Sequence, residues 1–251
     1  MPWQLARRGP RARAERFQPI ATSWYGAEQS REAPITLRAM APVGDMDLRR
    51  EKDGRVWRIG GNAEVTWIRE NVSYRGPMIA YAIPPVFEAY ATITLPVTPN
   101  THHGRWTGGW GWDEPAEGRD SSVLAVLEEH TQPQPWWLGY LNTTGDGAET
   151  IFPDVPKVEL YGWNYVLIEA GPEQAGSWRE PLGDWKGMLP DLMFPTDRSW
   201  VTSTLWDDYW TCIGASETLI EALLAHPYLR DHTRQVDPGS QDISPVHRSA
   251  P

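Results

Sequence analysis

The stretch that decides the fold class is Trp200-Val-Thr-Ser-Thr-Leu-Trp206, followed by Asp207-Asp208 and then by Tyr209-Trp-Thr-Cys-Ile213. Both flanking runs are rich in β-branched and aromatic residues, which favour strands. The acidic pair between them is typical of a tight turn. We therefore predict an antiparallel hairpin with a two-residue loop, in which Thr204 faces Thr211.

This hairpin has two unlike faces. The second face carries mainly apolar residues, and we expect it to be the core face because it matches the apolar stripe of a helix predicted from Ser216 to Ala225. The first face is aromatic and hydroxylated, so it is either packed under another segment or a binding platform. It contains Trp200, Trp206, Tyr209, Ile213 and three threonines, and the second contains Val201, Ser203, Leu205, Trp210 and Cys212.

Working outward from the hairpin, the chain mixes strands and helices with short links. A hairpin is expected over 48–59 around Asp53-Gly54, and the other expected strands are 64–68, 91–96, 136–142, 157–160 and 165–170. Helices are expected to begin at Pro85 and at Ser121 or Ser122, and residues 102–119 are expected to form a long loop.

The order of these elements is not a regular βαβ alternation. It predicts an α+β fold with a largely antiparallel sheet in a single domain over residues 46–231. Glycine and proline interrupt residues 1–45, which are expected to form a basic, irregular extension. Residues 232–251 are rich in Pro, Gly, Ser and Asp and are expected to form a disordered tail.

Composition narrows the class of protein. The chain of 251 residues is 40% hydrophobic and 22% charged, which is typical of a globular protein. It shows no apolar run long enough to cross a bilayer and no secretory signal, so we expect a cytoplasmic location without membrane contact. The 20 arginines against 3 lysines indicate a GC-rich, bacterial genome.

Charge is distributed unevenly. Residues 1–60 hold 12 basic and 7 acidic side chains, a balance of +5, and residues 61–251 hold 11 and 26, a balance of −15. The larger part is expected to repel nucleic acid and to attract basic partners. Five arginines between Arg7 and Arg16 form a basic arm, but no nucleic-acid recognition motif accompanies them, so nucleic-acid binding is disfavoured.

The most unusual segment is Trp106-Thr-Gly-Gly-Trp110-Gly-Trp112. Glycine lets a backbone approach a ligand closely, and tryptophan stacks on sugars, bases or cations. The same loop can instead fold back and bury its rings at a core edge. We take as candidate ligand- or partner-binding residues Trp106, Trp110, Trp112, Trp206, Asp207, Asp208 and Tyr209.

Other chemistry has weaker support in the sequence. His102 and His103 are adjacent and lack a third ligand, so no metal site is predicted. Cys212 is expected to be a buried, inert thiol. Paired-carboxylate hydrolysis by residues such as Asp184, Asp191 or Asp197 stays open, although Asp197-Arg198 after Pro195 is typical of a capped turn. No phosphate-binding or dinucleotide motif is present, and no cofactor is expected.

Four phrases of the chain resemble a family of uncharacterised actinobacterial proteins. They are Ala82-Ile-Pro-Pro-Val-Phe-Glu-Ala-Tyr90, Gln134-Pro-Trp-Trp-Leu-Gly-Tyr-Leu141, Glu169-Ala-Gly-Pro-Glu-Gln174 and Phe194-Pro-Thr-Asp-Arg-Ser-Trp200, the last continuing through Asp208. The resemblance spans about residues 65–231 and implies no activity, because none is established for that family.

Two functions follow as hypotheses. The acidic balance, the abundant tryptophan and the lack of a catalytic motif predict a cytoplasmic binding or inhibitory protein, of the kind that confers immunity by neutralising a basic protein such as a nuclease. The rival is an enzyme that acts on a small polar or sugar-like ligand beside Trp106, Trp110 and Trp112. The oligomeric state is not predicted.

Overall fold

The computed structural model describes residues 48–50, 56–73, 75–94, 97–102, 105–112, 116–142, 148, 152, 154–178, 189–205 and 210–243. Residues 1–42 form one unit of the chain and residues 43–251 a second one, so the described residues all belong to the second unit. The basic arm of the sequence analysis lies outside the described residues.

The centre of the second unit is a ten-stranded sheet in which every neighbouring pair is antiparallel. Its order is β1-β2-β8-β6-β9-β10-β11-β3-β12, and β7 lies off this path, paired with the first residues of β8. The predicted α+β fold with a largely antiparallel sheet is confirmed. The strands are β1 (Leu48–Arg50), β2 (Val56–Ile59), β3 (Ala89–Thr94), β6 (Trp136–Leu141), β7 (Val158–Leu160), β8 (Trp163–Ala170), β9 (Leu192–Pro195), β10 (Val201–Ser203), β11 (Trp210–Ala215) and β12 (Thr233–Val236).

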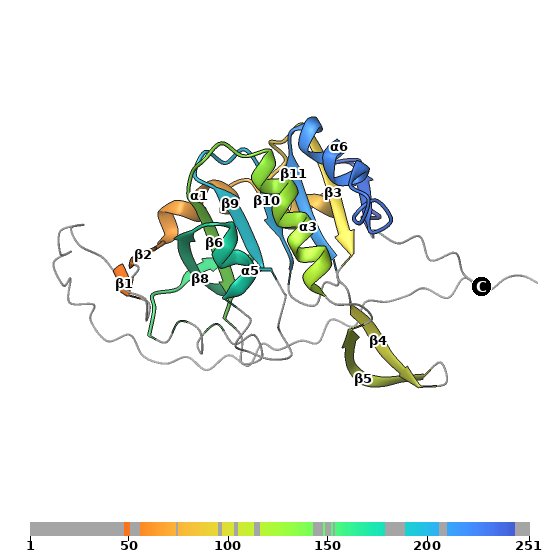
Figure 1. Ribbon diagram of the computed structural model, residues 1–251, viewed down its shortest axis with the longest axis horizontal. Helices are drawn as coiled ribbons and strands as arrows, with labels where there is room; N and C mark the ends of the chain where they lie inside the picture. Colours follow the sequence, from red (N-terminus) through yellow and green to blue (C-terminus); the bar gives the residue numbers. More distant parts are fainter. Residues whose placement is uncertain are drawn as a thin grey trace, which may run out of the picture. The chain divides into compact units, whose positions relative to one another are not determined.

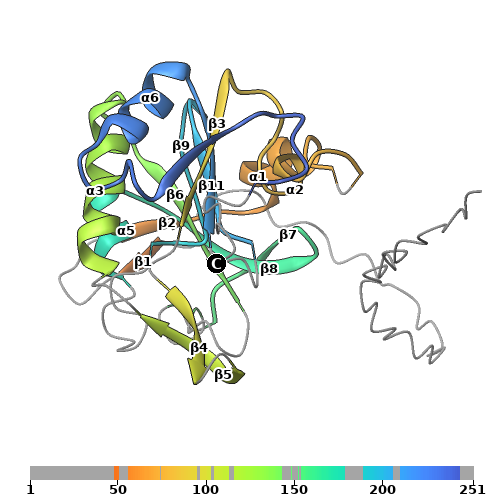
Figure 2. The same cartoon turned by 90° about the vertical axis from the view of Figure 1, so that its right-hand side faces the viewer.

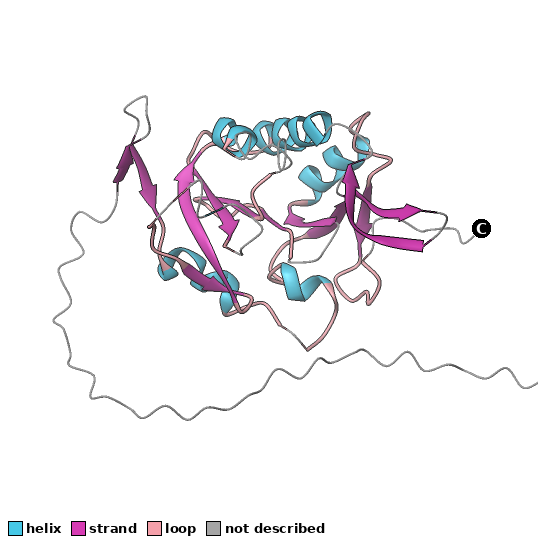
Figure 3. Cartoon of the chain, turned by 90° about the horizontal axis from the view of Figure 1, so that it is seen from below, coloured by secondary structure: helices cyan, strands magenta, loops and turns pink. Residues whose placement is uncertain are grey.

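Helices cover both faces of this sheet, as Figures 1 and 2 show. One layer contains α3 (Ala116–Glu129), α5 (Pro172–Ser177) and α6 (Glu217–Ala225), and the other contains α1 (Asn62–Arg69) and α2 (Ile79–Ala82). Seen from below in Figure 3, helices again lie on both sides of the strands. The chain therefore has two cores, one on each face of the sheet.

Strand β6 shows how the sequence supplies both cores. All six of its residues are buried, because alternate side chains enter opposite layers. Leu138 and Tyr140 belong to the core under α3, whereas Trp137 and Leu141 belong to the core under α1. A strand that is buried on both faces has a continuous apolar sequence, and this is why residues 136–142 could be predicted as a buried strand.

The late hairpin has the predicted register. In β10 and β11, Thr202 pairs with Ile213 and Ser203 pairs with Cys212, as a two-residue loop requires. The assignment of the following helix to the second face was wrong. Helix α6 packs on the first face, in the same core as Trp200 and Ile213, and the second face packs in the core of α1. Both faces are buried because helices cover both sides of the sheet.

Two expectations before β3 were also wrong. Residues 64–68 belong to α1 and not to a strand; Val65 and Ile68, one helical turn apart, are both buried, and the Glu64 carboxylate accepts from the Gly61 N–H at 2.8 Å. No helix begins at Pro85. Helix α2 comes before the prolines, and 84–88 is a turn that leads into β3, where the Phe87 N–H donates to the Tyr90 hydroxyl at 3.0 Å.

The predicted loop over 102–119 is instead regular structure. Strands β4 (Val97–His102) and β5 (Arg105–Trp112) form a separate two-stranded sheet, and α3 already begins at Ala116. Ser121 and Ser122 are therefore inside α3 and are not its cap. Both hydroxyls donate back to the Gly118 carbonyl, which is the usual way in which a helix accommodates serine.

The expected disordered tail is a further correction, because order continues past Asp231. Strand β12 pairs with β3, with Thr233 opposite Ile93, and both Val236 and Ile243 are buried in the core of α1. Polar composition concealed this strand, whose pairing with β3 supplies the hydrogen bonds that an edge strand would otherwise leave open. Residues 244–251 lie outside the described residues.

Candidate functional site

The sheet has two ends that differ in chemistry. We define the Thr94 end as the last residues of β3, β6 and β10 with the first residues of β9 and β11, and the Asp197 end as the opposite one. The pairs Thr94–Trp210 and Ser203–Leu192 mark the Thr94 end. The pairs Trp136–Pro195 and Ala89–Ala215 mark the Asp197 end.

The seven residues predicted to bind a ligand or partner come from two segments. Trp112, Trp110 and Trp106 lie on β5, and their backbones pair with three alternate positions of β4, Val97, Pro99 and Thr101. A register shift separates the last two pairs, at the glycines of β5. The other four residues, Trp206, Asp207, Asp208 and Tyr209, lie outside the described residues.

The structure brings the attachment points of these two segments together. Strand β4 begins three residues after Thr94, and segment 206–209 ends directly before Trp210. Thr94 and Trp210 are themselves a cross-strand pair. Two candidate segments about a hundred residues apart in the sequence are therefore attached to adjacent positions at the Thr94 end.

A buried ion pair lies at the same end. Arg119 and Asp120, in the first half of α3, are only 4% and 3% exposed. The Arg119 Nε donates to Asp120 Oδ1 at 2.7 Å, and its Nη2 donates to the same oxygen. Its Nη1 reaches the Thr94 carbonyl oxygen at 3.4 Å. Because a buried charge is costly without its partner, these contacts fix α3 against the last residue of β3.

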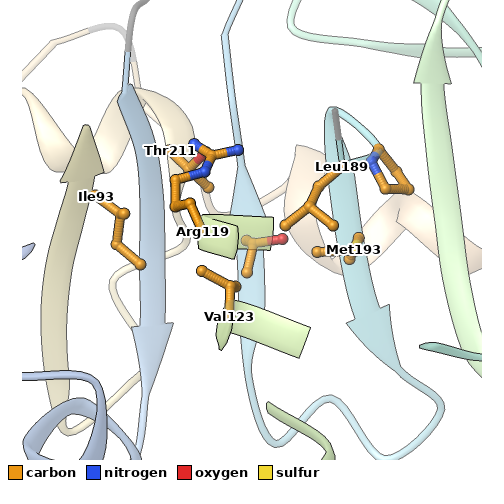
Figure 4. Close-up of a pocket in the computed structure, with 8 residues that line it drawn as sticks. Ile93, Arg119, Val123, Leu189, Met193 and Thr211 are labelled. Carbon is orange, nitrogen blue, oxygen red and sulfur yellow. The ribbon is translucent and has the colours of Figure 1, made fainter. Parts of the chain in front are cut away.

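Beside Arg119 the described residues line a small cavity (Figure 4). Its volume is about 10 Å³, which is at the lower limit for one water molecule. Apolar side chains form most of the wall, and two hydroxyls and the guanidinium supply the polar part. The lining residues are Ile93, Arg119, Val123, Leu189, Pro190, Met193, Thr202 and Thr211.

Hydroxyl groups are concentrated near this end of the sheet. Five buried ones have no hydrogen-bond partner within the described part of the chain, and they belong to Thr92, Thr94, Thr202, Ser203 and Thr233. Two more, those of Thr204 and Thr211, bond to each other at 2.8 Å. Buried polar groups are ordinarily satisfied, so this concentration distinguishes the Thr94 end as a place where polar contacts are incomplete.

Asp191 has a structural role in the arrangement. Its Oδ2 accepts from the Leu141 backbone N–H at 2.7 Å, and its backbone carbonyl accepts from the Thr204 N–H at 2.7 Å. These bonds join the ends of β6 and β10. Of the other carboxylates considered for hydrolysis, Asp184, Asp207 and Asp208 lie outside the described residues, so no catalytic pair is assembled from the ones that are described.

Asp197 lies at the other end of the sheet, in the capped turn predicted for it. Its Oδ2 accepts from Gln134 Nε2 at 2.7 Å, and its Oδ1 accepts from the Ser199 N–H at 2.9 Å. Burial raises the pKa of the Asp197 carboxyl, but the hydrogen bonds from Gln134 and Ser199 outweigh it and hold the pKa below its ordinary value. This carboxylate closes a turn and is not poised for proton transfer.

The remaining candidates do not form a site. Cys212 is 1% exposed, as predicted for an inert thiol. No three His, Cys, Asp or Glu side chains come together as metal ligands in the residues that the structure describes. His102 is in β4, and His103 lies outside the described residues.

Sequence reasoning missed the Arg119–Asp120 pair. The available signal was spacing: Arg119 stands four and eight residues before Val123 and Leu127, on the buried stripe of α3. A charged residue at a stripe position is unusual enough to be noticed. The mistaken start of the helix at Ser121 or Ser122 hid it.

The chain matches no known protein family, no curated protein and no solved structure in the comparisons made with them. Among the helices that the structure describes, none combines the length and the apolar character needed to cross a membrane.

Proposed function

We propose that this chain is a protein-binding protein of the bacterial cytoplasm, of the inhibitory or immunity type, which recognises a basic partner at the Thr94 end. The observation that carries the proposal is the Thr94–Trp210 pair, which attaches the segment with Trp106, Trp110 and Trp112 beside segment 206–209. Tryptophan is the commonest anchor of tight protein interfaces.

Charge defines the kind of partner. The balance of −15 over residues 61–251 favours the approach of a basic surface and disfavours nucleic acid and anionic membrane. Asp207 and Asp208 add two adjacent carboxylates between aromatic residues. Aromatic anchors with carboxylates beside them suit lysine and arginine side chains on the partner, through ion pairs and through stacking of cations on rings.

One observation favours the alternative, an enzyme that acts on a small polar or sugar-like ligand at the same end. Arg119 is a buried cation beside the hydroxyls of Thr202 and Thr211. Such a combination suits a ligand with oxygen atoms. The cavity of about 10 Å³ is far smaller than the pockets of about 300 Å³ or more that typically hold small-molecule ligands, so this cavity gives the enzyme only weak support.

The proposal is tested by affinity capture and calorimetry. The tagged full chain is used to capture proteins from its native host, the captured proteins are identified, and each purified candidate is titrated at several salt concentrations. We expect a basic partner whose affinity falls as salt rises. In parallel, the chain is screened against a metabolite library for turnover.

Two variants and a control make the test specific. Simultaneous replacement of Trp106, Trp110 and Trp112 by alanine should weaken binding at least a hundredfold, because anchors of this kind each contribute about 2 kcal/mol or more. Asp207→Asn with Asp208→Asn should reduce mainly the salt dependence. Trp163→Ala removes an exposed tryptophan elsewhere and should change nothing. Metabolite turnover without a captured basic protein would establish the enzyme instead.

A further inference from the structure

The cavity of Figure 4 is lined by two side chains with incomplete hydrogen bonding, Arg119 of α3 and Thr202 of β10. Thr202, on β10, is 1% exposed, and its Oγ1 has no hydrogen-bond partner among the described residues. Arg119 reaches the same cavity from α3. A buried hydroxyl left without a partner costs about 1–3 kcal/mol, so its presence on a cavity wall requires an explanation.

Arg119 has hydrogen-bonding capacity to spare. A guanidinium group carries five N–H donors. One on Nε and one on Nη2 go to Asp120 Oδ1, and one on Nη1 makes a long contact of 3.4 Å with the Thr94 carbonyl. Two N–H groups have no acceptor within the described part of the chain, although the side chain is only 5% exposed.

The local charge and the cavity volume indicate which molecule supplies the missing hydrogen bonds of Arg119 and Thr202. The carboxylate of Asp120 already balances the guanidinium, so an added anion would be a buried, uncompensated charge. A volume of about 10 Å³ matches one water molecule. Water is neutral. It can accept a hydrogen bond from the Arg119 guanidinium and can donate to or accept from the Thr202 hydroxyl.

We propose that this cavity is the binding site of one ordered water molecule, which accepts from the Arg119 guanidinium and bonds to Thr202 Oγ1. The water joins α3 to β10 at the Thr94 end, in addition to the direct contact of Arg119 with the Thr94 carbonyl. This proposal does not depend on the proposed function, because it concerns the free protein.

The first test compares two threonines that differ only in their surroundings. Thr92 is also fully buried with a partnerless Oγ1, but it lies on the opposite face of the sheet and does not line the cavity. Thr202→Val removes a hydroxyl that the water satisfies, so the folding equilibrium constant should fall roughly three- to tenfold. Thr92→Val removes an unsatisfied hydroxyl and should leave this constant unchanged or raise it.

The second test is direct and does not depend on the stability of a variant. A crystal structure of the full chain at high resolution should show one water in contact with Arg119 and Thr202, and the same crystal form of Thr202→Val should lose it. A bromide soak distinguishes a water from an anion by anomalous scattering. Bromide at the site, an empty cavity, or equal effects of Thr202→Val and Thr92→Val would overturn the proposal.

Discussion

The two ends of the sheet differ in how completely their polar side chains are hydrogen-bonded. At the Asp197 end, side chains complete the turns: Gln134 bonds to Asp197, and Trp200 Nε1 donates to Thr131 Oγ1 at 2.7 Å. At the Thr94 end, hydroxyls such as that of Thr94 are buried without a partner in the described part of the chain. The hydrogen bonds at the Asp197 end therefore stabilise the fold, whereas these hydroxyls at the Thr94 end add no such stabilisation within the described residues.

The largest effect is expected from Trp200→Ala at the Asp197 end. Trp200 is fully buried, it packs edge-on against Trp136 with ring centroids 4.8 Å apart, and it donates to Thr131. Truncation should lower the free energy of unfolding by about 3–5 kcal/mol. Urea denaturation followed by circular dichroism measures it, with Trp163→Ala, 37% exposed, as the control. A similar loss in both variants would contradict the comparison.

Gly214→Ala should have the next largest effect. A methyl group on Gly214 would lie 2.5 Å from Ile83 Cγ2 and 2.5 Å from Phe87 Cδ2, so β11 or the turn before β3 has to shift. We expect a loss of about 1–3 kcal/mol. Gly118→Ala, in α3, is the matched control, because its methyl group meets only ordinary contacts at 3.4 Å with Tyr228 and should stabilise the helix by up to about 1 kcal/mol.

Gln134→Ala tests how strongly the Asp197 turn is held. The variant loses the bond from Gln134 Nε2 and the one accepted by Gln134 Oε1 from the Asp197 N–H, which should cost about 1–2 kcal/mol. Because the folded-state pKa of Asp197 is lowered, its carboxylate stabilises the fold above its ordinary value of 3.8 and stops doing so as pH falls through the lowered folded-state pKa. Urea midpoints measured between neutral and acidic pH should show a weaker acid dependence in Gln134→Ala.

Thr94→Val should have the smallest effect, and it tests the other end. The Thr94 Oγ1 is buried and has no partner among the described residues, so its replacement should be neutral or should stabilise by up to about 1 kcal/mol. At the Asp197 end, Thr131→Val removes the acceptor of Trp200 Nε1 and should cost about 1–2 kcal/mol. If Thr94→Val lowered the free energy of unfolding more than Thr131→Val, the two ends would not differ in the way described.

Local signals were sufficient for part of the fold. The register of β10 and β11 followed from Asp207-Asp208 between two β-rich runs, and the helix after Ser216 followed from its cap, since Ser216 Oγ does accept from the Leu219 N–H. Both features depend on residues close in sequence. Strand β6 was recognisable because burial on both sides leaves a purely apolar run.

Other features depend on partners far away in the chain. Strand β12 is polar in sequence and exists as a strand because β3 offers it an edge. The double covering of the sheet, which misled the assignment of the hairpin faces, needs knowledge of where α1 and α6 pack. The sequence pointed to the Thr94 end only through the candidate tryptophans and carboxylates, because the buried hydroxyls of Thr94 and Thr202 look like ordinary strand residues in the sequence.

The position of β3 between β11 and β12 also determines when the protein can fold. Ile93 is paired on one side with Thr211 and on the other with Thr233, more than a hundred residues later in both cases. A ribosome must therefore release nearly the whole sheet before β3 has either neighbour, and contacts of such long sequence separation slow folding. Until then, β3 is an apolar strand with two open edges, the state in which a nascent chain most needs a chaperone.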